Sequence, residues 1–118
     1  MSTNLSIADL AANLWSDSDF DATFELIKTG STLIYAIEVD NESNTVSSYA
    51  KFYNATAPTV GTTAPDMVIE VPAAEKLTVV FPQGLTFGTG LSAACVTVGG
   101  TTGTSGPANN VTLEVAYT

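Results

Sequence analysis

From residue 22 onward, apolar and polar side chains alternate with a period of two, which is the pattern of half-buried β-strands. The clearest example is the stretch 32–40, where Leu33, Tyr35, Ile37 and Val39 fall on one side. Clusters of Gly, Pro, Thr and Asn separate the alternating stretches and mark turns. The pattern predicts about seven strands, at residues 22–28, 32–40, 45–53, 67–71, 76–81, 91–98 and 111–117.

Short strands at regular spacing predict one all-β domain, a single antiparallel β-sandwich. Between the strands the sequence offers no helix that could serve as the crossover of a parallel sheet. An immunoglobulin-like arrangement and a jelly roll both fit this pattern. The paired cysteines and intervening tryptophan of true immunoglobulin domains are missing, because Cys95 is the only cysteine.

The connections predict further detail. Residues 73–75 should form a tight turn that folds 67–81 into a hairpin, and Pro82-Gln83-Gly84 should end its second strand. We expect residues 85–90 to form a loop anchored by Leu85 and Phe87. The stretch 99–110, rich in Gly, Thr and Ser, should be a long tip, which could either make contacts or project freely.

The first 21 residues follow a different pattern. Ile7, Leu10 and Leu14 recur at helical spacing, Trp15 follows directly, and Ser6 could cap the helix. Such a short helix is marginal alone and needs a surface to pack on. We therefore expect residues 1–21 to form an arm or short helix and residues 22–118 to form the sandwich, with an extended arm as the alternative. Ile7, Leu10, Leu14 and Trp15 are the candidate residues for contact with another subunit or a partner protein.

Charge and composition narrow the function. The net charge is −9, and only Lys28, Lys51 and Lys76 are positive, so the chain should repel nucleic acid and anionic membranes. We see neither a signal peptide nor an apolar run long enough for a membrane helix, and expect synthesis in the cytoplasm. Cys95 lies in an apolar stretch and should be a buried small hydrophobe.

Groups for catalysis or metal binding are scarce, so we expect no enzyme, no cofactor and no metal site. The chain has no His, and a single Cys cannot form a common zinc site. Asp17, Asp19 and Asp21 resemble the start of a calcium loop but lack its Gly and its distal Glu, which favours a solvated hinge. The remaining acids are scattered over strands and turns, with no implied cleft for a carboxylate pair.

Two other patterns have plain structural explanations. The glycines near residues 84–90 lack the following helix and the Lys of a phosphate loop, and they fit a loop with positive φ angles. Tyr35, Tyr49, Tyr53 and Tyr117 could form a platform for sugar binding. Tyrosines on strands more often act as half-buried cross-strand partners or subunit contacts.

Four segments form a recognisable series. They are Lys51-Phe52-Tyr53-Asn54, Pro58-Thr59-Val60-Gly61-Thr62, Val71-Pro72-Ala73 and Phe81-Pro82-Gln83-Gly84-Leu85-Thr86-Phe87-Gly88-Thr89-Gly90-Leu91. In this order, followed by an apolar last strand, they resemble a family of small virion proteins of tailed bacteriophages. The resemblance covers residues 45–118. One departure is Ala74, where the family tends to have Gly.

The resemblance implies a structural component of a phage particle. Size, acidity and the scarcity of catalytic groups then favour a capsid decoration (cement) protein on the outer capsid surface, made in the host cytoplasm. Such a protein would clamp adjacent copies of the major capsid protein, and we expect a homotrimer. The alternatives are a tail, neck or fibre adaptor of the virion, or a carbohydrate-binding module for the host surface.

Overall fold

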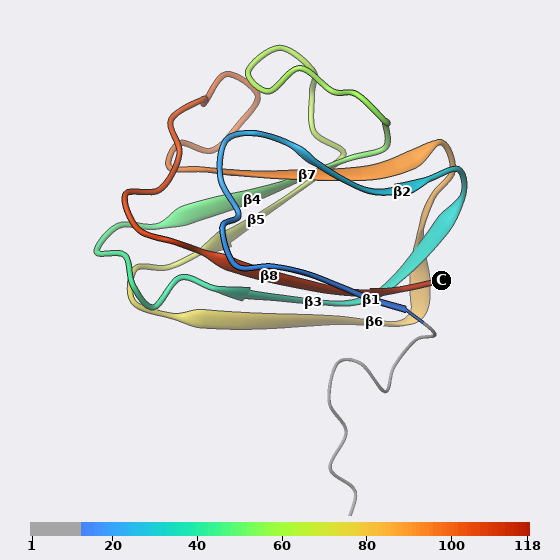
Figure 1. The fold of residues 1–118 in the computed structure, drawn as a ribbon, viewed down its shortest axis with the longest axis horizontal. Helices are drawn as coiled ribbons and strands as arrows, with labels where there is room; N and C mark the ends of the chain where they lie inside the picture. Colours follow the sequence, from blue (N-terminus) through green and yellow to red (C-terminus); the bar gives the residue numbers. More distant parts are fainter. Residues whose placement is uncertain (1–12) are drawn as a thin grey trace, which may run out of the picture.

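The computed structural model describes residues 13–118, which fold into two antiparallel four-stranded sheets packed face to face (Figure 1). This confirms the all-β sandwich, and the described chain contains no helix. Eight strands are present, one more than expected. They are β1 (Asn13–Asp17), β2 (Glu25–Thr29), β3 (Thr32–Asp40), β4 (Ser48–Tyr53), β5 (Met67–Val71), β6 (Lys76–Phe87), β7 (Gly90–Val96) and β8 (Thr112–Tyr117).

The strand order is that of a jelly roll. Sheet A has the order β1-β8-β3-β6, and sheet B has the order β2-β7-β4-β5. The first four strands pair with the last four in reverse, as β1 with β8, β2 with β7, β3 with β6 and β4 with β5. The chain is therefore one long hairpin rolled into two layers, which the pairs β3–β8 and β4–β7 complete.

Alternate residues of the strands build the core between the sheets. On β3 the core side chains are Ile34, Ile37 and Val39, and on β8 they are Leu113 and Val115. All five are at most 1% exposed. Burial of these β-branched and aliphatic side chains supplies the main driving force for closing the sandwich.

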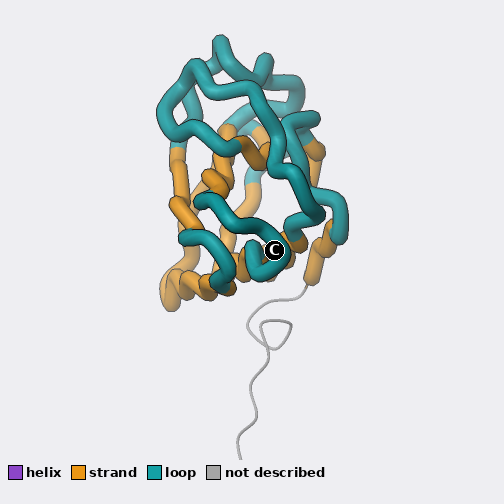
Figure 2. The backbone as a smooth tube through the Cα atoms, turned by 90° about the vertical axis from the view of Figure 1, so that its left-hand side faces the viewer, coloured by secondary structure: helices purple, strands orange, loops and turns teal. Residues whose placement is uncertain are grey.

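A third layer covers the outer face of sheet B. There Ser92, Ala94 and Val96 point away from the core, yet all three are fully buried. The two long connections, residues 54–66 and 97–111, lie over this face (Figures 1 and 2). The predicted tip at 99–110 therefore packs onto the sandwich instead of projecting freely.

The predicted hairpin at residues 67–81 is wrong in its pairing. The turn lies where expected, with Ala74 at φ 60°, a left-handed conformation that Gly adopts more easily. However, β5 pairs with β4 in sheet B, whereas β6 pairs with β3 in sheet A. The turn thus carries the chain from one sheet to the other.

The second strand of that segment does not end at Pro82. Pairing with β3 stops after Val80, opposite Ala36, and resumes at Leu85, opposite Ile34. Four residues of β6 therefore bulge opposite Tyr35 alone. Proline cannot donate a ladder hydrogen bond, which explains the interruption, but the strand then continues to Phe87.

The N-terminal prediction needs correction for its last part. Residues 13–15, expected to end a helix, belong to β1, which pairs with β8 from Asn13↔Tyr117 to Asp17↔Leu113. Phe20 is also part of the core. The ladder to β8 pairs the backbone groups on one side of this segment and packs Trp15 against the core, whereas a short isolated helix is only marginally stable. Sheet A thus takes in part of the segment expected to be an arm, and the predictions for residues 1–12 lie outside the described residues.

Candidate interaction surface

The structure separates the residues that the sequence grouped as a contact stripe. Ile7 and Leu10 lie outside the described residues. Leu14 and Trp15 are neighbours on β1 and therefore point to opposite faces of sheet A. Trp15 packs against the core, whereas Leu14 faces outward and is 45% exposed. Of the described pair, Leu14 is the more exposed residue, and Trp15 is partly buried.

Leu14 begins an apolar row across the outer face of sheet A. It pairs with Ala116, Ala116 pairs with Ala36, and Ala36 pairs with Val80. Val80 at the far edge is 49% exposed, while the two alanines between are fully buried. The row crosses all four strands, and only its two ends, Leu14 and Val80, reach the surface. We call Leu14, Ala116, Ala36 and Val80 the apolar row.

A polar, acidic row lies next to the apolar row. Glu114 and Glu38 are direct cross-strand partners, and Thr78 follows on β6 and donates a hydrogen bond to Glu38. Lys76 forms an ion pair of 3.4 Å with Glu38, and this carboxylate raises the pKa of Lys76. The outer face of sheet A is thus apolar along one row and negative along the next.

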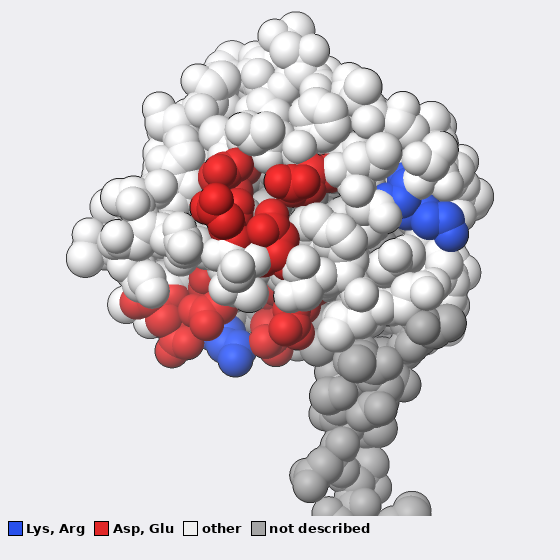
Figure 3. Space-filling model, viewed as in Figure 1, with Lys and Arg blue, Asp and Glu red and all other residues white. Residues whose placement is uncertain are grey.

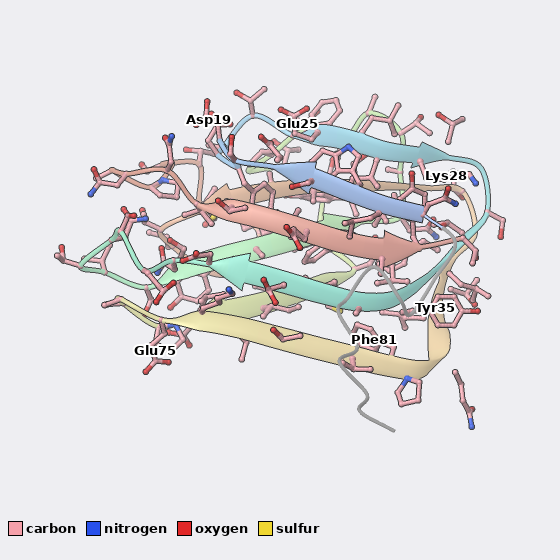
Figure 4. All side chains as sticks on the ribbon, turned by 60° about the horizontal axis from the view of Figure 1, so that its bottom comes forward. Asp19, Glu25, Lys28, Tyr35, Glu75 and Phe81 are labelled. Atoms are coloured by element: carbon pink, nitrogen blue, oxygen red, sulfur yellow. The ribbon has the colours of Figure 1, made fainter. Side chains whose placement is uncertain are left out.

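A second acidic group lies where β1 leads into β2, and Figure 3 shows acidic atoms gathered on this side of the molecule. Asp19 and Glu25 lie close together there, while Lys28 lies at the other end of β2 (Figure 4). Burial, followed by the charges of Asp17, Asp21 and Asp19, raises the pKa of Glu25. In the described part of the chain, no three acidic or Cys side chains are placed to hold a metal ion.

Lys51 is the residue whose setting the sequence did not reveal. It points outward from β4 but is fully buried under the covering loops, where its ammonium group donates hydrogen bonds to the carbonyls of Gly103 (3.0 Å) and Thr101 (3.4 Å). Burial lowers its pKa. The lysine links the third layer to sheet B. Its neighbours Ala50 and Phe52 face the core, so the alternation along β4 already indicated that Lys51 points outward.

The four tyrosines do not form one platform. Tyr49 and Tyr53 are on β4 in sheet B, whereas Tyr35 and Tyr117 are in sheet A. Tyr53 is fully buried, its hydroxyl has no hydrogen-bond partner among the described residues, and burial raises its pKa. Tyr49 is half-buried and donates a hydrogen bond to Glu70. A single sugar-binding surface built from all four rings is therefore not assembled.

One hollow of about 360 Å³ lies at the bulge of β6, lined by Phe81, Pro82, Gln83 and Gly84. Tyr35 lies at the same end of the sheet as Phe81 (Figure 4). The lining carries no ionisable side chain, so it offers apolar contact and one amide and no acid or base.

No described helix is long and apolar enough to cross a membrane.

Comparison with known proteins assigns this chain to no family. No protein-family model and no curated protein matches the chain. The features that bear on function are therefore the sequence segments, the fold and the two surface rows.

Proposed function

We propose that this protein is a structural component of a tailed-bacteriophage particle, and that it acts as a capsid decoration protein. In this proposal it sits as a homotrimer on the outer capsid surface and clamps neighbouring copies of the major capsid protein. The jelly roll supports the proposal only by analogy, because this architecture occurs in viral capsid domains and also in lectins and cupins.

The observation that carries the proposal is where the phage-like segments lie in the fold. Lys51 and Phe52 fix the covering loop and the core. Gly61 lies so close to the methyl group of Thr104 that a side chain there would clash, so the glycine lets the two covering loops pack closely. These segments, with the turn near Pro72 and the bulge at Pro82, maintain the scaffold, so the resemblance to virion proteins rests on residues that build this fold.

The outer face of sheet A supplies the contact surface in this proposal. The exposed ends of the apolar row, Leu14 and Val80, would pack on the capsid, together with Ile7 and Leu10 of the preceding segment. Contact at many equivalent lattice sites, coupled through a trimer, gives avidity even when each contact is weak. Binding only to the expanded shell would stabilise that state by mass action.

Copy number in purified particles is the direct test. We expect hundreds of copies per particle, measured by mass spectrometry and gel densitometry relative to the major capsid protein, and heads that break more easily once the protein is removed. A few copies would instead indicate a tail, neck or fibre adaptor. Absence from the particle would leave the carbohydrate-binding alternative.

A deletion tests the contact surface. Removing residues 1–12 leaves β1 and its ladder to β8 intact, so the variant should fold and keep its melting temperature within a few degrees. It should lose binding to expanded, undecorated heads, and Val80→Asp should weaken binding as well. Val46→Asp is the control, because Val46 is similarly exposed at 53% but lies outside the apolar row. Full binding by both the deletion and Val80→Asp would contradict this placement.

A further inference from the structure

The edge of β5 differs from the other sheet edges in the described chain. Each sheet ends in two edge strands, β1 and β6 in sheet A, and β2 and β5 in sheet B. A free edge presents unpaired backbone groups that can pair with another strand, and proteins usually block such edges with lysine, proline, bulges or inward-facing charges.

Three of the four edges carry such a block. On β1, Asp17 lies on the core-facing side with Trp15, and its Oδ2 is buried without a hydrogen-bond partner among the described residues. On β2 the register shifts between Leu26 and Lys28, and the lysine lies in the strand itself. On β6 the proline and the bulge at residues 81–84 interrupt the edge.

The β5 edge has none of these devices. Met67–Val71 pairs with β4 in one continuous register, without a bulge, a proline or a lysine, and Glu70 is its one charged residue. Met67 and Ile69 pack against the core but remain half-buried, and so do Leu77 and Phe81 on β6 across the same open side. The side of the sandwich at β5 is therefore incompletely covered.

The two faces of β5 define what an added strand would need. Its inner face would continue the half-buried apolar surface of Met67 and Ile69, so the strand needs apolar residues there. Its outer face would meet Val68, which is 39% exposed, and the carboxylate of Glu70. Asp66 adds a second carboxylate next to the start of β5. A complementary strand would therefore alternate apolar and basic residues.

We propose that β5 is a docking edge for an extended segment of a partner protein, in which apolar residues alternate with Lys or Arg. The segment would add a fifth strand to sheet B, with backbone hydrogen bonds giving affinity and the alternating side chains giving specificity. A five-residue edge is about 17 Å long, so a partner segment of five to seven residues covers it. The proposal does not depend on the particle in which the protein works.

A synthetic peptide tests the proposal directly. The probe is an acetylated and amidated heptapeptide that alternates Lys and Val, titrated into the full-length protein and followed by amide NMR shifts. We expect shifts concentrated on β5 and its neighbour β4, and little change with a peptide that carries Glu in place of Lys. Methylating one alternate set of peptide amides should abolish binding, while methylating the other set should be tolerated.

Matched variants separate strand addition from attraction by the acidic surface. Val68→Lys blocks the edge and should weaken peptide binding at least tenfold. Val46→Lys adds the same charge to an exposed Val outside the strands and should change binding less than twofold. Similar thermal melting of both variants and the natural protein would show that folding is intact. Equal weakening of peptide binding by both variants would overturn the proposal. So would amide shifts centred on residues 17–25 instead of β5.

Discussion

At the scale of single residues, Cys95 shows how burial in the core between the sheets changes side-chain chemistry. Every residue of β7 is buried, because the core covers one face and the loops cover the other. This burial raises the pKa of the Cys95 thiol from 9.0 to about 12, and the nearby charge of Asp21 adds to the rise, while a hydrogen bond with Ser48 opposes it. The thiol should therefore be unreactive in the folded protein.

The raised pKa predicts an alkaline loss of stability. Above pH 9 the unfolded chain releases the thiol proton while the folded chain keeps it, so folding stability falls as the pH rises from 9 toward 12. The stability advantage of the natural protein over Cys95→Ala should shrink by about 1.4 kcal/mol per pH unit in this range. Urea unfolding of both proteins at pH 8, 9, 10 and 11 under reducing conditions measures it. A constant difference would contradict the assigned burial.

At the scale of elements, the bulge of β6 requires a particular glycine. Gly84 has a φ of 81°, and a Cβ there would lie 3.2 Å from atoms of Leu33 and 3.3 Å from the ring of Tyr35. Gly84→Ala should therefore reduce the free energy of unfolding by about 2 kcal/mol, from backbone strain and crowding together.

Two other glycines serve as controls for Gly84→Ala. Gly30 has a similar φ of 86° but open space around its Cβ position, so Gly30→Ala should cost about 1 kcal/mol from strain alone. Gly88 has open space and no positive φ, so Gly88→Ala should be close to neutral. Denaturant unfolding of the three variants gives the comparison, and equal losses for Gly84 and Gly88 would show that the bulge is not constrained.

Local pattern predicted most strands because alternation is a local property. The bounds 32–40 and 67–71 match β3 and β5, and the turn at Ala74 lies where the sequence placed it. The predictions that failed concern strand pairing, which depends on contacts between residues far apart in the sequence. Nothing near Pro72 tells whether the next strand pairs with the last one or crosses to the other sheet. The bulge at Tyr35 also shifts the alternation, so that Ile34 instead of Leu33 enters the core.

The candidate surface was predictable only in part. Leu14, one of the four residues predicted to make contacts, is an exposed apolar side chain, but the helical spacing also selected Trp15, which β1 turns toward the core. Ala36, Ala116 and Val80 belong to three different strands. Only the register of sheet A brings them into one row with Leu14, and register is set by pairing across the whole fold.

At the scale of the whole molecule, charge is distributed unevenly. On the face drawn in Figure 3, acidic side chains gather on the side where β1 leads into β2, and Glu114 and Glu38 are paired beside the apolar row, while the β5 edge carries Glu70 with Asp66 directly before it and no Lys. Repulsion between these acidic groups discourages association of copies of the protein through the same surfaces. The same repulsion costs stability, and Glu25 offers a way to measure that cost.

Glu25→Gln should stabilise the protein at neutral pH. The pKa of Glu25 is raised, first by burial and then by Asp17, Asp21 and Asp19, so the folded carboxyl keeps its proton at pH values where the unfolded one has lost it. Stability from this group is therefore highest below its unfolded pKa of 4.5 and falls as the pH rises through the folded pKa. Because the site is partly screened by water, we expect a gain of about 0.5 kcal/mol at pH 7.

The gain should vanish below pH 4, where both forms of the carboxyl are neutral, and should shrink in 1 M NaCl, which screens the three aspartates. Urea unfolding of the natural protein and the variant at pH 3.5, 5 and 7 measures this dependence. Glu75→Gln is the matched control, since it removes the same charge from an exposed turn away from this cluster (Figure 4). An equal gain from both variants would mean that net charge alone, and not the local cluster, sets the cost. A gain that persists at pH 3.5 would show that Glu25 acts by packing instead of charge.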